Sequence, residues 1–282
     1  MKSGFINWPW EDPIWTFHWW IADFPGEGTV FSQVKYRGRK IFHKASVPLI
    51  RVHYDGNHGP YKDSLNAHNL SYIKIYQCQI SGLLTLAVDA YHKGGSLGRY
   101  HLLNRWLFLS DGTILPQLHS AGLQHDANHR HHVYWRFDFD IDGASSDLAL
   151  YHSNWALDWG YGPGWWPIES ESWLLKSPGE RAWAVMNTPN GPGYVITPGP
   201  FDGRADSFSL ADAYVLRYRG SEDLQGALGS RYSDDLKTLM KEMESTDKTD
   251  IVFWYIAHLP HVAHDNGDEW HVCGPILRRF GV

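Results

Sequence analysis

The chain has 282 residues, a formal net charge of −6 at pH 7, 43% hydrophobic residues and 20% charged residues. These values exclude a disordered chain, and the mild acidity gives none of the basic footprint that a nucleic-acid-binding surface needs. The apolar stretches are too short to span a membrane and the first residues do not resemble a secretion signal, so we expect a cytoplasmic protein with no membrane partner. Two cysteines, Cys78 and Cys273, are too few for a disulfide scaffold.

Short apolar or alternating segments, separated by turn residues, indicate β-strands along most of the chain. In chain order, the predicted strands are 28–36, 47–54, 71–88, 106–109, 133–141, 172–176, 182–186, 194–197, 213–218 and 250–256. Asp-Gly pairs at 55–56, 111–112, 142–143 and 202–203 predict tight turns. One helix is predicted over 233–244, and the Gly- and Trp-rich segment 155–166 is predicted to be a loop. The expected fold class is therefore all-β, with residues 1–282 forming one mostly antiparallel domain.

A histidine-rich segment near the middle of the chain carries the clearest candidate chemistry. If it forms a strand, alternate residues share a face, and His129 and His131 begin a face that continues with apolar residues. Two imidazoles one strand repeat apart can bind one metal ion. The alternative is a pair of core histidines held by hydrogen bonds, and these residues alone leave both interpretations open. The opposite face, which includes His132, Asp138 and Asp140, is expected to be solvated.

A third ligand is expected near the predicted strand 250–256, which is apolar on both faces, as a central buried strand should be. His258 is the preferred candidate because it follows this strand closely, and His261 is the alternative. Three imidazoles without a thiolate suit copper, zinc or iron, and a tetragonal set of nitrogen ligands favours Cu(II).

Several blocks of sequence carry a further signal when they are taken in chain order. They are Trp15-Thr16-Phe17, Val34-Lys35-Tyr36, Tyr61-Lys62-Asp63-Ser64, 100–114 with Trp106, His129-x-His131 with Asp140-Ile141-Asp142-Gly143, and 250–254 with His258-Leu259-Pro260. In this order they resemble the catalytic domain of the copper amine oxidases, the topaquinone-containing primary amine oxidases, over nearly the whole chain. The resemblance implies a twisted antiparallel β-sandwich with few short helices, without the family's smaller N-terminal domains. It also implies one copper ion bound by His129, His131 and His258, and a homodimer.

The resemblance further implies roles for four residues. Tyr100 matches the tyrosine that the family oxidises to topaquinone, whose carbonyl condenses with a primary amine. Asp63 matches the catalytic base, Tyr54 matches the tyrosine that hydrogen-bonds the quinone, and Tyr61 matches the aromatic gate residue. The strand that follows Tyr100 is expected to pair near the strand of His129.

Three departures from the family pattern bear on activity. Arg99 and His101 flank Tyr100 where the family has Asn and an acidic residue, and that Asn helps to position the tyrosine and later the quinone. The segment between Asp63 and Tyr100 is much shorter than in the family, so a loop that would shape the substrate channel is missing. His261 stands where the family has Arg. The resemblance therefore supports the fold and the copper more than it supports amine oxidation.

The sequence leads to two hypotheses of function. The first is a copper-dependent oxidoreductase that uses O2 on a small-molecule substrate. In one version Tyr100 becomes a quinone and the enzyme deaminates a primary amine; in the other it stays a tyrosine and the copper activates O2 for a different oxidation, as in a biosynthetic pathway. The alternative is a Trp-rich β-sandwich that binds a sugar without catalysis, suggested by Trp155, Trp159, Trp165 and Trp166.

Overall fold

The computed structural model describes most of the chain. The described residues are 2–23, 26–56, 58–153, 160–175, 182–187, 191–220, 236, 240, 243–264 and 268–281. Most of the predicted helix 233–244 lies outside them, as do Trp155 and Trp159. Within the described residues, no helix is long and apolar enough to cross a membrane.

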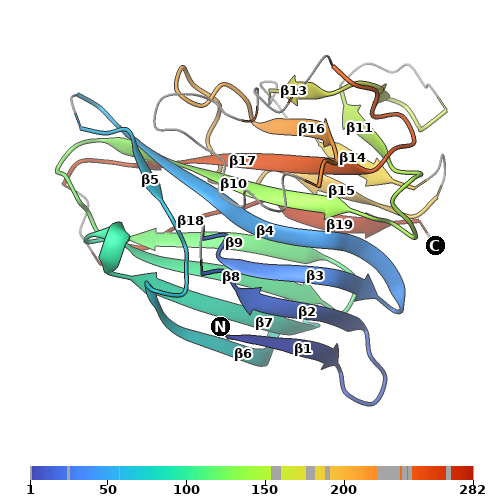
Figure 1. The fold of residues 1–282 in the computed structure, drawn as a ribbon, viewed down its shortest axis with the longest axis horizontal. Helices are drawn as coiled ribbons and strands as arrows, with labels where there is room; N and C mark the ends of the chain where they lie inside the picture. Colours follow the sequence, from blue (N-terminus) through green and yellow to red (C-terminus); the bar gives the residue numbers. More distant parts are fainter. Residues whose placement is uncertain are drawn as a thin grey trace.

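The first of two antiparallel sheets carries the histidine-rich strand near its centre. Its strand order is β1 (Ser3–Trp8), β2 (Trp15–Ile21), β3 (Thr29–Tyr36), β4 (Arg39–Tyr54), β10 (His129–Phe139), β17 (Ile251–His261), β16 (Ala213–Arg217) and β13 (Ser172–Leu174). The short strand β5 (Tyr61–Asp63) pairs with β4. Figure 1 shows β4, β10 and β17 running side by side.

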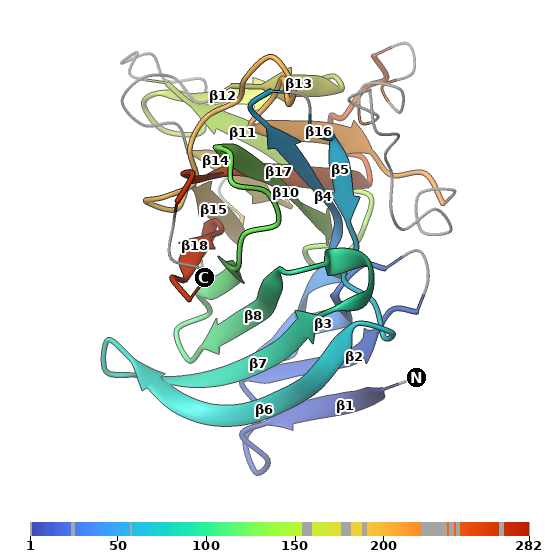
Figure 2. The ribbon, with the colours of Figure 1, turned by 90° about the vertical axis from the view of Figure 1, so that its left-hand side faces the viewer.

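The second sheet faces the first. Its strand order is β12 (Trp165–Ile168), β11 (Leu148–His152), β14 (Trp183–Met186), β15 (Gly193–Thr197), β19 (Ile276–Phe280), β9 (Ile114–Ala121), β8 (His101–Leu109), β7 (Leu83–Lys93) and β6 (Leu70–Ile80). Strand β18 (His271–Cys273) pairs with β9, and a 3-10 turn, η1 (Gly95–Leu97), precedes β8. Figure 2 shows the strong twist and curvature of β6, β7 and β8. The predicted fold class, an all-β antiparallel β-sandwich with few short helices, is confirmed.

Aromatic side chains fill the space between the two sheets. Trp15 and Phe17 on β2, Phe31 on β3, and Trp106 and Phe108 on β8 are all buried. Across the sandwich their ring centroids lie 4.7 to 5.3 Å apart. Burial of each such side chain contributes about 1.5–3 kcal/mol, so the cluster fixes β8 firmly over β2 and β3. The residue that precedes β8 is thereby held close to the interior.

One predicted strand, 71–88, is instead a β-hairpin. Strands β6 and β7 pair in antiparallel register around Ser81 and Gly82. Both residues have positive φ, 50° and 79°, which is the backbone of a tight two-residue turn. The sequence does not reveal this turn because apolar residues continue on both sides of it and Ser-Gly is a weaker hairpin signal than Asp-Gly.

Apart from the exposed Arg130, strand β10 is buried on both faces, and the expectation of one solvated face is wrong. His132, Asp138 and Asp140 are at most 5% exposed. A second group of buried apolar side chains, which includes Tyr134 on β10 and Trp254 on β17, lies on this face of the sheet. A central strand between two covered faces therefore alternates between two buried environments, not between core and solvent.

Candidate metal centre and cavity

Strands β10 and β17 bring three buried histidines together. In their antiparallel register His129 lies opposite His261, and His131 projects from the same face of β10 as His129. One ring nitrogen of each histidine lies within 4.8 Å of the other two. The three side chains are at most 3% exposed. We term this group the three-histidine site.

The ring nitrogens of the three-histidine site fit a metal ion. His129 Nδ1 lies 3.0 Å from the Ala127 carbonyl oxygen, to which it donates when Nε2 keeps its lone pair. Both ring nitrogens of His131 and Nε2 of His261 are buried without a hydrogen-bond partner among the described residues. Burial lowers the pKa of His131 well below its usual range, and burial together with His129 and His271 lowers the pKa of His261 to about 3. Unpaired polar atoms are costly to bury, and neutral imidazoles are metal ligands, so a bound ion would satisfy this group.

His258, preferred as third ligand from the sequence, lies on the opposite face of β17. It pairs in register with His132, and the Nδ1 atoms of these two side chains are 2.8 Å apart. The alternative, His261, is the histidine that joins His129 and His131. Residues three apart in a strand lie on opposite faces, so His258 and His261 cannot both face His129.

Tyr100 approaches the three-histidine site from the other sheet. Its hydroxyl lies 3.0 Å from His129 Nε2, and its ring centroid lies 4.8 Å from that of His131. The same hydroxyl is hydrogen-bonded to the hydroxyl of Tyr54 at the end of β4. The expected pairing of the Tyr100 strand near the His129 strand is wrong: β8 and β10 belong to different sheets, and the contact is made across the sandwich. Burial raises the pKa of Tyr100 above its usual range.

A cavity of about 560 Å³ opens beside Tyr100. Its lining brings together Tyr54, Tyr61, Asp63 and Tyr100, the four residues singled out by the resemblance. Asp63 is 5% exposed, and its Oδ2 has no hydrogen-bond partner among the described residues. Burial raises the pKa of Asp63 to about 7 and that of Tyr54 to about 12. Tyr61 is 37% exposed, so it is the member of the four that solvent reaches most easily.

Two histidines near these groups were not assigned a role from the sequence. His125 lines the cavity, and its ring stacks on His58 at 4.4 Å and meets Tyr54 edge-on at 5.2 Å. It lies between β9 and β10, where no strand periodicity predicts the direction of a side chain. His271 on β18 lies with its ring centroid 4.3 Å from that of His261. Its proximity depends on the pairing of β18 with β9, which no local pattern encodes.

Solved structures with a similar fold are copper amine oxidases. A copper-containing benzylamine oxidase from Hansenula polymorpha matches with a TM-score of 0.72 and 15% identity, over 99% of this chain and 61% of that one. The lysyl oxidase of Pichia pastoris matches with a TM-score of 0.70 and 14% identity, over 95% and 52%. An amine oxidase from Aspergillus nidulans matches with a TM-score of 0.70 and 16% identity, over 95% and 51%. The chain has the β-sandwich fold of these oxidases.

The similarity is one of structure and not of sequence. No protein-family model matches the chain, and no curated protein matches it by sequence. The chain spans between about half and three fifths of the length of the three oxidases.

Proposed function

We propose that this chain is a copper-dependent oxidoreductase that uses O2 to oxidise a small molecule held in the cavity. The three-histidine site carries the proposal, because one ring nitrogen of each buried imidazole lies within 4.8 Å of the other two and the group contains no thiolate. A set of nitrogen ligands of this kind suits copper. The fold shared with a copper-containing oxidase supports copper over zinc or iron. When bound, copper supplies one-electron redox chemistry with O2.

The cavity residues would hold the substrate and accept its proton. Asp63 lines the cavity, and a pKa of about 7 places this carboxyl group close to the optimum for a general base at neutral pH. The hydrogen bond between Tyr54 and Tyr100 holds the Tyr100 ring against His129. Tyr61, half-exposed beside Asp63, would contact the substrate as it enters.

Two versions of the reaction differ in the fate of Tyr100. If Tyr100 is converted to topaquinone, the substrate is a primary amine and Asp63 removes its α-proton. If Tyr100 remains a tyrosine, no quinone is formed, and copper held by the three-histidine site would itself supply the redox chemistry for a different oxidation. We favour the second version, because Arg99 replaces the Asn that positions the quinone in the family.

Copper analysis of purified variants tests the ligand set. His261→Ala should lose one equivalent of copper relative to the wild type, because one of its three nitrogen ligands is gone. His264→Ala is the matched control: this imidazole is exposed and lies 2.9 Å from Asp126, and its removal should leave copper unchanged. Oxygen uptake with a panel of small amines and alcohols should follow the copper content of the same variants.

Two results would contradict this assignment. Full copper in His261→Ala together with loss in His258→Ala would move the third ligand to the other face of β17. Wild-type protein without stoichiometric copper would remove the oxidase proposal and favour the sugar-binding alternative. Of the tryptophans that suggest this alternative, Trp165 and Trp166 lie half-buried on β12, and Trp155 and Trp159 lie outside the described residues.

A further inference from the structure

A second cluster of ligating side chains lies on the opposite face of β10. His53 near the end of β4, His132 on β10, and Asp206 each offer one ligand atom, and these atoms lie within 4.8 Å of one another. None of the three belongs to the three-histidine site. The His132 side chain is fully buried, and its Nε2 has no hydrogen-bond partner among the described residues. A buried nitrogen of this kind needs a partner.

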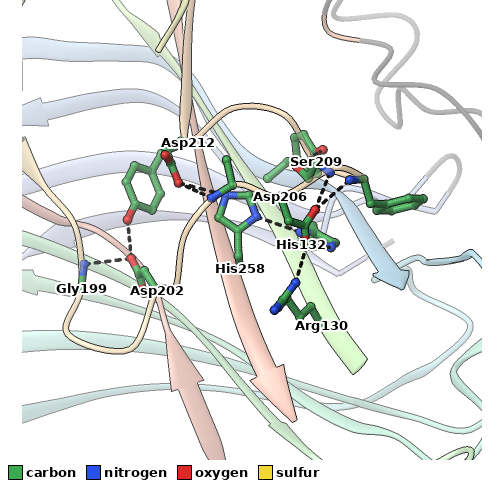
Figure 3. Close-up of polar contacts among 12 residues, drawn as sticks. Arg130, His132, Gly199, Asp202, Asp206, Ser209, Asp212 and His258 are labelled. Carbon is green, nitrogen blue, oxygen red and sulfur yellow. Dashed lines mark hydrogen bonds and ion pairs between the residues drawn. The ribbon is translucent and has the colours of Figure 1, made fainter. Parts of the chain in front are cut away.

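The contacts behind His132 determine which of its nitrogens keeps a lone pair. His258 Nε2 lies 3.1 Å from Asp212 Oδ1, and His258 Nδ1 lies 2.8 Å from His132 Nδ1, as Figure 3 shows. The Nε2 atom of His258 makes no aligned hydrogen bond to a described residue, but the nearby Asp212 carboxyl group favours a proton on it, which leaves His258 Nδ1 free to accept. His132 then donates from Nδ1 and keeps its lone pair on Nε2. A metal-binding histidine usually has its second ring nitrogen fixed by a hydrogen bond, and His258 can fill that role for His132.

Asp206 faces this lone pair. The backbone N–H groups of Phe208 and Ser209 donate to Asp206 Oδ1, so the carboxylate is fixed by the loop that carries it. Its Oδ2 lies 3.9 Å from His132 Nε2. Two ligand atoms bound to one ion at about 2.1 Å in tetrahedral geometry lie roughly 3.4 Å apart. The observed gap is therefore close to what an ion between the two atoms requires. The Phe208 ring stacks on His53 at 4.4 Å and orients the third ligand.

We propose that His53, His132 and Asp206 form a second metal site, which binds a divalent first-row transition metal of the zinc class. Two imidazoles and one carboxylate are a ligand set for such an ion and leave a position open to water or to a small ligand. The carboxylate distinguishes this set from the nitrogen-only three-histidine site. The two sites lie on either side of one sheet, because His131 and His132 are consecutive residues of β10.

Arg130 competes with the metal ion for Asp206. Its Nη1 lies 2.6 Å from Asp206 Oδ2, and its side chain is 50% exposed, so it can withdraw into solvent when the ion binds. Removal of the guanidinium should therefore tighten metal binding. If the three side chains do not form a metal site, the protein should bind no metal at this place, with or without Arg130.

Zinc binding to His261→Ala tests the proposal without the three-histidine site, so the result is independent of the copper proposal. After chelator treatment, zinc loading and desalting, this variant should retain one equivalent of zinc. Adding Asp206→Asn or His53→Gln should abolish it; Asp206→Asn preserves an acceptor for the Phe208 and Ser209 N–H groups. His43→Gln is the matched control, because it removes an exposed histidine of the same strand as His53. It should leave one equivalent of zinc bound.

Affinity supplies a second readout. In the same background Arg130→Gln should lower the dissociation constant for zinc about two- to fivefold, the effect of removing one partly exposed ion pair. Cobalt(II) should give visible absorption bands that disappear with Asp206→Asn, and melting curves show whether each variant is folded. Folded His261→Ala protein without bound zinc, or equal zinc in the Asp206→Asn and His43→Gln variants, would overturn the proposal.

Discussion

At the scale of single residues, the buried carboxyl group of Asp63 lowers the stability of the fold when it is charged, and the same group is the proposed general base. Its pKa of about 7 in the folded chain lies above the ordinary value of 3.8, because burial disfavours the charged form. Between these values the folded chain holds a proton that the unfolded chain releases. The free energy of unfolding therefore falls as pH rises from about 4 to about 7, and the cost is complete above pH 7.

Asp63→Asn should remove this dependence on pH. We expect the variant to match the wild type in acid and to exceed its free energy of unfolding by up to about 4 kcal/mol above pH 7. Oxidation should be lost at the same time, because the amide cannot act as a base. Urea unfolding across this range measures the difference, with Asp55→Asn, an exposed carboxyl, as control. A difference that stays constant with pH would show that Asp63 does not titrate in this window.

Tyr100 should remain a tyrosine in the copper-loaded chain exposed to oxygen. Its hydroxyl is hydrogen-bonded to the Tyr54 hydroxyl and lies 3.0 Å from His129 Nε2, and Arg99 replaces the Asn that positions the quinone in the family. The intact mass should equal that of the encoded sequence, and Tyr100→Phe should keep copper but lower oxygen uptake. A visible absorption band and a reaction with phenylhydrazine, both absent in Tyr100→Phe, would instead establish a quinone.

At the scale of elements, the alternation within β10 could be read from the sequence and the register between strands could not. His129 and His131 share a face because a strand repeats every two residues. The third histidine depends on how β17 lies against β10. Because β17 is apolar on both faces, nothing in its own pattern marks the face that meets His129. A shift of one residue in a strand exchanges its two faces, so the preference for His258 over His261 rested only on its closeness to the predicted strand, and the register reverses it.

The fold class could also be predicted from local sequence patterns. The features that could not be predicted depend on how the two sheets pack. Alternating segments and turn residues indicate an antiparallel β protein wherever they occur. The burial of His132 and Asp138 depends on what covers the second face of the sheet. The contact between Tyr100 and His129 depends on two sheets facing each other. Only the resemblance to a known family, not any local pattern, connected Tyr100 with Asp63.

Gly122 lies against the backbone that precedes Tyr100 and β8, and a substitution there tests how tightly these two segments pack. It follows β9 with a φ of +91°, and a Cβ there would lie 2.3 Å from the carbonyl oxygen of Arg99. Gly122→Ala should therefore displace the backbone before Tyr100. Gly82→Ala is the matched control, because Gly82 has a φ of +79° and open space around it.

In the control, Gly82→Ala, the free energy of unfolding should fall only by the cost of placing alanine at a positive φ, about 1–2 kcal/mol. In Gly122→Ala the free energy of unfolding should fall by about 1–3 kcal/mol more, because the added Cβ clashes with backbone and not with a flexible side chain. Chemical unfolding measures both values. Equal losses in the two variants would mean that the neighbouring backbone yields without cost.

At the scale of the whole molecule, a homodimer stays a prediction that rests on the resemblance to the copper amine oxidases. Sedimentation should give a species with about twice the 32.3 kDa mass of the chain. A single 32.3 kDa species at all concentrations would contradict it.

Copper should stabilise the whole fold, because its proposed ligands come from two neighbouring central strands. His129 and His261 are far apart in sequence and meet only when β10 and β17 pair, so the ion binds the folded chain in preference to the unfolded one. Linkage gives about 2.7 kcal/mol of stabilisation at a free copper concentration 100 times the dissociation constant. The melting temperature of the wild type and of His264→Ala should rise with copper, and that of His261→Ala should respond far less. If all three rose equally, copper would be acting through other groups, and the unpaired nitrogens of His131 would need a different partner.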